Sequence, residues 1–98
     1  MGARTSSART TRKRVRPIKV SKSTLEKSKR RIPSRLSEIR GPRSQRSFAR
    51  ELGVFQQNVN RYENGTTPHA DFLITLALKE NVSLDWLLLG RGKPHRKA

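Results

Sequence analysis

Residues 45–65 read QRSFARELGVFQQNVNRYENG, and this stretch predicts two short helices joined by a tight turn. The first helix is expected at about residues 45–52, because the hydroxyl of Ser44 is well placed to cap its N-terminus. Its apolar residues recur at helical spacing and share one face: Phe48, Ala49 and Leu52. Gly53 follows directly, and glycine adopts a positive φ at little cost, so Gly53 is expected to end the helix and reverse the chain.

The second helix is expected at about residues 56–63, with Asn64-Gly65 as its stop signal. Helical spacing gives it one apolar face, made of Phe55, Val59 and Tyr62. The opposite face carries Gln57, Asn60, Arg61 and Asn64, with Gln56 at its edge. Amides form paired hydrogen bonds with adenine and guanidinium groups do so with guanine. A solvated surface would more commonly carry Lys and Glu, so this face predicts the reading helix of a helix-turn-helix.

When they are aligned together without gaps between them, these motifs resemble the helix-turn-helix family of lambda-type phage repressors, Cro proteins and Xre regulators. The similarity covers about residues 35–90. Its landmarks are Gln45, Ala49, Gly53-Val54, Gln56-Gln57, Val59, Tyr62-Glu63-Asn64-Gly65 and the run VSLDWLL at residues 82–88. The resemblance implies an all-α, five-helix lambda-repressor-like DNA-binding domain. Its remaining helices would lie at about residues 35–40 (after Ser34 as cap), 70–80 and 84–89.

The resemblance also implies roles for individual side chains. DNA base contacts would come from Gln56, Gln57, Asn60 and Arg61. DNA backbone contacts would come from Gln45, Arg43, Arg46 and Asn64. Gln45 would in addition brace Gln56, at the start of the reading helix. Arg40 and Glu63 would form a structural ion pair, with Glu63 as a simple surface acid as the alternative.

The sequence departs from the family pattern at three places. The link Gly41–Ser44 is short and contains Pro42, which is expected to shorten or tilt the first helix. Phe55 stands at the N-cap of the reading helix, where its side chain cannot accept a backbone hydrogen bond. Inward packing of Phe55 is favoured over contact with a thymine methyl group. His69 replaces a capping serine before the fourth helix and is expected on the surface.

The chain has a net charge of +16, which favours a polyanionic partner. Residues 1–34 hold 12 Lys and Arg against one acid, so the N-terminal third carries most of the excess. The first 22 residues are too polar to bury a core and are expected to be disordered. Nonspecific phosphate contacts are expected from Arg12, Lys13, Arg14 and Arg16.

These features divide the chain into a basic, largely disordered arm at residues 1–33, a helix-turn-helix domain at residues 34–90 and a basic tail at residues 91–98. A capping box that begins at Ser23 predicts a possible short helix within the arm, at residues 24–31. Pro33 is expected to end this helix.

The sequence offers little support for catalysis. It contains no cysteine, and its two histidines, His69 and His95, have no metal-ligand spacing. It also contains no phosphate-binding loop or nucleophile motif. We therefore expect no enzyme, no catalytic residue, no cofactor and no metal, and we find no sign of a small-molecule ligand or a membrane partner.

The sequence thus favours a sequence-specific regulator of transcription that binds double-stranded DNA, a phage- or prophage-type repressor located in the cytoplasm at the nucleoid. The antitoxin of a toxin–antitoxin pair and a low-specificity RNA- or nucleoid-binding protein are the alternatives. A homodimer could form through Trp86 and Leu89 or through the N-terminal segment, although Trp86 as an ordinary core residue is an equal alternative.

Overall fold

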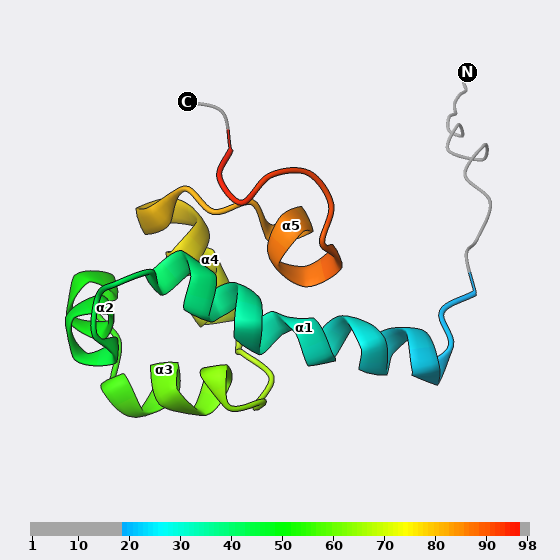
Figure 1. The fold of residues 1–98 in the computed structure, drawn as a ribbon, viewed down its shortest axis with the longest axis horizontal. Coiled ribbons are helices and arrows are strands. Elements are labelled where there is room, and N and C mark those ends of the chain that lie inside the picture. Colours follow the sequence, from blue (N-terminus) through cyan, green and yellow to red (C-terminus); the bar gives the residue numbers. More distant parts are fainter. Residues whose placement is uncertain (1–18, 97–98) are drawn as a thin grey trace, which may run out of the picture.

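The computed structural model describes residues 19–96, and within them the chain is all-helical. The helices are α1 (Lys22–Arg40), α2 (Gln45–Leu52), α3 (Gln56–Glu63), α4 (Ala70–Glu80) and α5 (Leu84–Leu89), as Figure 1 shows. In this part of the chain the only β-type pairing is an isolated antiparallel bridge between Val82 and His95. The predicted all-α, five-helix fold is confirmed. The expected arm residues Arg12, Lys13, Arg14 and Arg16 lie outside the described residues.

The first helix differs most from the sequence prediction, because α1 runs without interruption for 19 residues and contains Pro33. The predicted end of a short helix at Pro33, and a separate helix at residues 35–40, were wrong. Proline costs about 3 kcal/mol inside a helix because it lacks an N–H group. Three apolar side chains of α1 are nevertheless buried against the rest of the domain: Ile32, Leu36 and Ile39. Their burial outweighs the local penalty, as tertiary packing commonly does for short helices.

The cap of α1 also lies earlier than predicted. Ser21, rather than Ser23, is the N-cap residue, and its side chain accepts a hydrogen bond from the backbone N–H of Thr24 at 3.2 Å. Ser34 does not cap a helix. Its hydroxyl donates to the carbonyl oxygen of Arg31 at 3.1 Å, within the same helix.

The core lies where α1 packs against α3 and α5, and where α2 packs against α3 and α4. Its buried side chains are Ile32, Leu36, Ile39, Phe48, Ala49, Leu52, Val59, Tyr62, Phe72, Leu76, Val82 and Leu87. The Tyr62 and Phe72 rings meet edge to face, with their centroids 4.8 Å apart. Trp86 is partly buried and packs against this cluster, so it contributes to the core while keeping some exposure.

The turn between α2 and α3 has the predicted geometry. The Ser44 side chain accepts from the backbone N–H of Ser47 and begins α2. Gly53 ends the helix at φ 74° and ψ 32°, which is the left-handed region that favours glycine. The backbone N–H of Val54 then donates to the carbonyl oxygen of Ala49 at 3.0 Å. Together these contacts fix the direction in which α3 leaves the turn.

The C-terminal segment folds back onto the domain instead of extending away from it. The backbone N–H of Ser83 donates to the carbonyl oxygen of Pro94 at 2.8 Å, and that of Arg96 donates to Asn81 at 3.0 Å. The Arg96 guanidinium also donates to the carbonyl oxygen of Ala77 in α4 at 3.0 Å. Residues 91–96, which the sequence assigned to a basic tail, are therefore attached to the end of α4 in this structure.

Candidate nucleic-acid interface

The exposed side of α3 carries the four predicted base-contacting residues. Gln56, Gln57, Asn60 and Arg61 are all exposed and line one shallow hollow on the surface. On the opposite side of the same helix Val59 and Tyr62 are buried, so packing fixes which face points outward. In Figure 1, α3 forms the lower edge of the domain. We call the four residues that line the hollow the reading face.

One residue of the reading face, Asn60, is hydrogen-bonded to α2. The Asn60 side-chain amide donates to Oε1 of Gln45 at 3.2 Å, and Nε2 of Gln45 donates to Oε1 of Glu63 at 3.1 Å. The prediction that Gln45 braces Gln56 was therefore wrong about its partner, which is Asn60 in this structure. Asn60 lies about one helical turn after Gln56 and reaches the Gln45 amide. This hydrogen bond restricts the orientation of the Asn60 side chain on the reading face.

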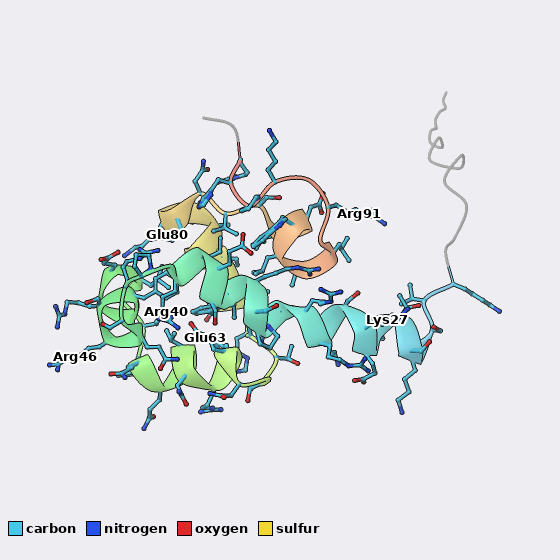
Figure 2. The ribbon with its side chains drawn as sticks, viewed as in Figure 1. Lys27, Arg40, Arg46, Glu63, Glu80 and Arg91 are labelled. Carbon is cyan, nitrogen blue, oxygen red and sulfur yellow. The ribbon has the colours of Figure 1, made fainter. Side chains whose placement is uncertain are left out.

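Glu63 occupies the centre of a hydrogen-bond network between α1, α2 and α3. Nε of Arg40 lies 2.8 Å from Oε2 of Glu63, and Nη2 of Arg40 lies 3.0 Å from Oε1. The hydroxyl of Ser37 donates to the same carboxylate at 3.1 Å. Figure 2 shows Arg40 and Glu63 directed toward each other across the interface between α1 and α3. The predicted ion pair is thus bidentate, which is the strong arrangement for an arginine and a carboxylate.

The electrostatics of this network stabilise both charges. Burial by itself would raise the pKa of Glu63, whose side chain is only 6% exposed. Hydrogen bonds from Arg40, Gln45 and Ser37 outweigh this effect and hold the pKa of Glu63 below its usual value. The hydrogen bond to Glu63 raises the pKa of Arg40. Glu63 is therefore a structural carboxylate and not a simple surface acid.

Arg43 was predicted to contact the DNA backbone, but in this structure its guanidinium binds groups inside the protein instead. Its Nε donates to the carbonyl oxygen of Arg40 at 2.9 Å, and Nη2 donates to that of Ile39 at 2.8 Å. Its two Nη atoms also bind the carboxylates of Glu51 and Glu80 at 2.7–3.2 Å. Hydrogen bonds to Glu80, and then to Glu51, raise the pKa of Arg43. All five N–H groups have partners inside the protein, so none remains for a phosphate.

The position of Arg43 explains how the short link between α1 and α2 is held. Its guanidinium carbon lies 4.7 Å from the centre of the Phe48 ring, over the buried core. It also binds the last carbonyl oxygens of α1 and, through Glu80, the end of α4. The partner Glu80 is 37 residues away in sequence, and no local pattern could have revealed it.

Two other predicted backbone contacts flank the reading face. Arg46, in the first turn of α2, is exposed and directed outward in Figure 2. Asn64 is exposed at the end of α3, where its side-chain amide donates to the carbonyl oxygen of Asn60 at 2.7 Å. The backbone N–H of Thr66 donates to the carbonyl oxygen of Arg61 and orders the loop that follows. The two side chains therefore lie in the first turn of α2 and directly after the last residue of α3.

Phe55 is the largest exposed apolar side chain beside the reading face. The sequence favoured inward packing, but 79% of Phe55 is exposed, so that prediction was wrong. As the N-cap residue of α3 it makes no side-chain cap hydrogen bond. Val54 packs partly against the core instead and fills the inward position next to the turn. Phe55 is left on the surface, adjacent in sequence to Gln56.

Two helices joined by a left-handed glycine, the second with amides and an arginine on its exposed side, define a helix-turn-helix DNA-binding domain. The family model for the bacteriophage CI repressor helix-turn-helix domain matches residues 17–95, and the chain belongs to this family. No solved structure matches the chain. The expected resemblance is confirmed, and the chain is a DNA-binding regulator of the repressor type. None of the helices described is long and apolar enough to cross a membrane.

Proposed function

We propose that this protein is a sequence-specific, phage- or prophage-type transcription factor that inserts α3 into the major groove of double-stranded DNA. The observation that supports the proposal most strongly is the composition of the reading face. Its hollow is lined by three amides and a guanidinium, and no acidic side chain of the described residues lines it. Such a surface offers paired donors and acceptors to base edges without repelling the phosphates.

The chemistry of the reading face predicts which bases it prefers. Gln56, Gln57 and Asn60 would pair with adenine, and Arg61 would pair with guanine, each at about 1–3 kcal/mol of discrimination. Phe55 would lie at the start of the reading helix, where its exposed ring can contact the methyl group of thymine. The preferred site would accordingly be rich in A·T pairs and contain at least one position at which guanine is required.

Contacts with phosphates would set the register of the domain on DNA. Gln45 and Arg46 of α2 and Asn64 after α3 would bind the backbone on either side of the groove. The arm residues would add affinity for any sequence: Arg12, Lys13, Arg14 and Arg16. Each phosphate contact would make the slope of log K against log salt steeper by about 0.9. A protein of this kind would act at the nucleoid.

A homodimer on a two-fold site is the expected form of the complex, because helix-turn-helix repressors commonly bind half-sites about one helical turn apart. The last helix offers Leu89, which is 51% exposed, beside the partly buried Trp86. These two residues are the surface through which we expect two copies to meet.

Selection of bound sites from a pool of random DNA duplexes at a fixed salt concentration tests this function. We expect enrichment of one short A·T-rich motif with a fixed guanine, repeated as a palindrome if the protein binds as a dimer. Duplex RNA of the same length is the control and should bind more weakly. Equal retention of all DNA sequences, or equal affinity for RNA, would contradict the proposal and support a low-specificity nucleic-acid-binding protein.

A further inference from the structure

The N-terminal part of α1 extends past all the other helices. In Figure 1 it projects to the right of the domain, away from α2 and α4. We call residues 22–31 the α1 extension; ten residues of helix measure about 15 Å. Every residue in it is exposed except the half-buried Ser28, and continuous burial begins only at Ile32. Packing within the described chain therefore does not account for the extension.

The α1 extension carries an excess of positive charge that its own acids do not balance. It contains one acid, Glu26, and five basic residues: Lys22, Lys27, Lys29, Arg30 and Arg31. The first turn of α1 contains no acidic residue. Of the five basic residues only Lys22 lies in this turn, where the positive end of the helix dipole makes its charge unfavourable. Lys27 stands at helical spacing from Arg30 and Arg31, where like charges repel one another. A segment that departs from a local rule in this way commonly serves a function, and here an anion would remove the conflict.

Part of this charge lies beside the loop that leaves the reading helix. Lys29 and Arg30 line one surface hollow together with Gly65 and Thr67 of the α3–α4 loop, and with Glu26 and Pro33 of α1. The ion pairs found within residues 19–96 involve neither Lys29 nor Arg30. Glu26 stands four residues before Arg30 on the same helix and still forms no ion pair with it. Both cations therefore face solvent next to the end of α3.

This placement matters because Asn64, directly before Gly65, is a proposed contact to the DNA backbone. A DNA strand held at Asn64 would continue past the α3–α4 loop toward the hollow that Lys29 and Arg30 line. One strand carries about one phosphate per 3.4 Å of helix axis, so successive phosphates of a strand that passes this hollow lie close enough together for Lys29 and Arg30 to bind. The dimensions and the charge both suit a DNA backbone.

We infer that Lys29 and Arg30 form a second phosphate-binding site, which extends the contact with DNA beyond the helix-turn-helix. This inference rests on the proposed function. The site contacts the backbone of the strand that leaves the major groove near Asn64 and reads no base. It therefore raises the affinity for every DNA sequence and leaves the preference between sequences unchanged.

A matched pair of double variants of the full chain tests the site. Lys29→Gln/Arg30→Gln removes the two cations beside the α3–α4 loop. The control, Lys27→Gln/Arg31→Gln, removes two cations from a different hollow, which Arg35 and Leu89 also line near α5. Both variants lose the same charge from the same helix segment. Circular dichroism and thermal unfolding of each variant first establish that α1 and the domain are retained.

Binding to the selected DNA duplex is then measured over a range of salt concentrations. We expect Lys29→Gln/Arg30→Gln to bind about tenfold more weakly and to lower the steepness of log K against log salt by about 1.8, as for two lost phosphate contacts. The control should change both quantities much less. In Lys29→Gln/Arg30→Gln, the ratio of the affinities for the selected and a scrambled duplex should equal that of the unchanged protein.

Equal effects of the two double variants would overturn the inference, because they would show a general effect of charge. An unchanged affinity and salt slope in Lys29→Gln/Arg30→Gln would also overturn the inference, because it would show that these two residues do not contact DNA. Either result leaves the proposed function standing if the unchanged protein still prefers its selected site. If the unchanged protein shows no preference for any duplex, the proposed function itself fails.

Discussion

Arg43 and Arg61 carry the same side chain and lie 18 residues apart, yet the structure gives them opposite surroundings. Arg43 meets two carboxylates, two carbonyl oxygens and an aromatic ring, and it uses every donor inside the domain. Arg61 is exposed and lines a hollow without an acid among its described lining residues. The comparison teaches that the position of acidic partners, more than residue type, separates a structural arginine from one available to DNA.

The same contrast extends to the regions around the two residues. We call Arg40, Arg43, Gln45, Glu63 and Glu80 the support network, because their contacts join α1, α2, α3 and α4. The reading face contributes little to these contacts, apart from the hydrogen bond between Asn60 and Gln45. Changes in the support network should therefore alter the stability of the fold, whereas changes at Gln56, Gln57 and Arg61 of the reading face should alter DNA binding alone.

The largest effect on stability is expected from Arg40→Ala. It leaves the carboxylate of Glu63, whose side chain is 6% exposed, without its charged partner. Loss of one partner of a buried pair costs about 3–5 kcal/mol, and the 23% exposure of Arg40 places the expected loss near the lower limit, at about 3 kcal/mol. Urea unfolding measures it. The exposed Arg50→Ala is the control and should stay within about 0.5 kcal/mol of the unchanged protein.

Arg43→Ala tests whether Arg43 stabilises the fold or contacts the DNA backbone. The change removes the partner of Glu80 and the cation over Phe48, so we expect a loss of about 2 kcal/mol in the free energy of unfolding. DNA affinity, measured at a temperature where the variant is fully folded, should stay the same. Unchanged stability together with a weaker and less salt-dependent DNA affinity would instead show that Arg43 contacts the DNA backbone.

A smaller effect is expected at the turn between the two helices. Gly53→Val forces a β-branched residue into the left-handed region, at a cost of about 1–2 kcal/mol. A Cβ at this position would meet only Nζ of Lys79 at 3.7 Å, so the penalty comes from the backbone. Gly53→Asn is the matched control, because asparagine tolerates this conformation. Equal thermal stability of the two variants would argue against the left-handed turn.

The smallest effect is the dependence of stability on pH through Glu63. Its pKa is lower in the folded protein, so its contribution is present above the unfolded value of about 4.3 and is lost as the pH falls through the folded value. The difference in unfolding free energy between the unchanged protein and Glu63→Gln should accordingly narrow below about pH 4. A difference that stays constant from pH 7 to pH 3 would show that Glu63 carries no depressed pKa.

The sequence predicted α2, the turn and α3 with their observed boundaries because the signals there are local. Ser44 and Gly53 each act through the backbone atoms of their own helix, and the Asn64-Gly65 pair ends α3. The reading face followed from helical spacing alone, since burial of Val59 and Tyr62 determines which side is exposed. These features need no knowledge of distant residues.

The predictions that differ from the structure share a physical cause, which is that their outcome depends on distant contacts. Pro33 would end an isolated helix, but α1 continues because its C-terminal half is buried. Arg43 looked available because Glu80 lies 37 residues away in sequence. Phe55 was expected to pack inward, whereas Val54 fills the inward position at the turn. Local pattern supplies no information on any of these partners.

The most direct test of the central claim compares Arg61→Ala with Arg91→Ala on the selected duplex. Figure 2 shows Arg91 on the α5 side of the molecule. Both residues are exposed arginines, so the two variants lose the same charge from the surface. We predict that Arg61→Ala costs about 1–3 kcal/mol of binding free energy and relaxes the preference at one base position, without a change in thermal stability. Arg91→Ala should retain the full preference. Equal binding and unchanged base preference in both variants would contradict the assignment of the reading face.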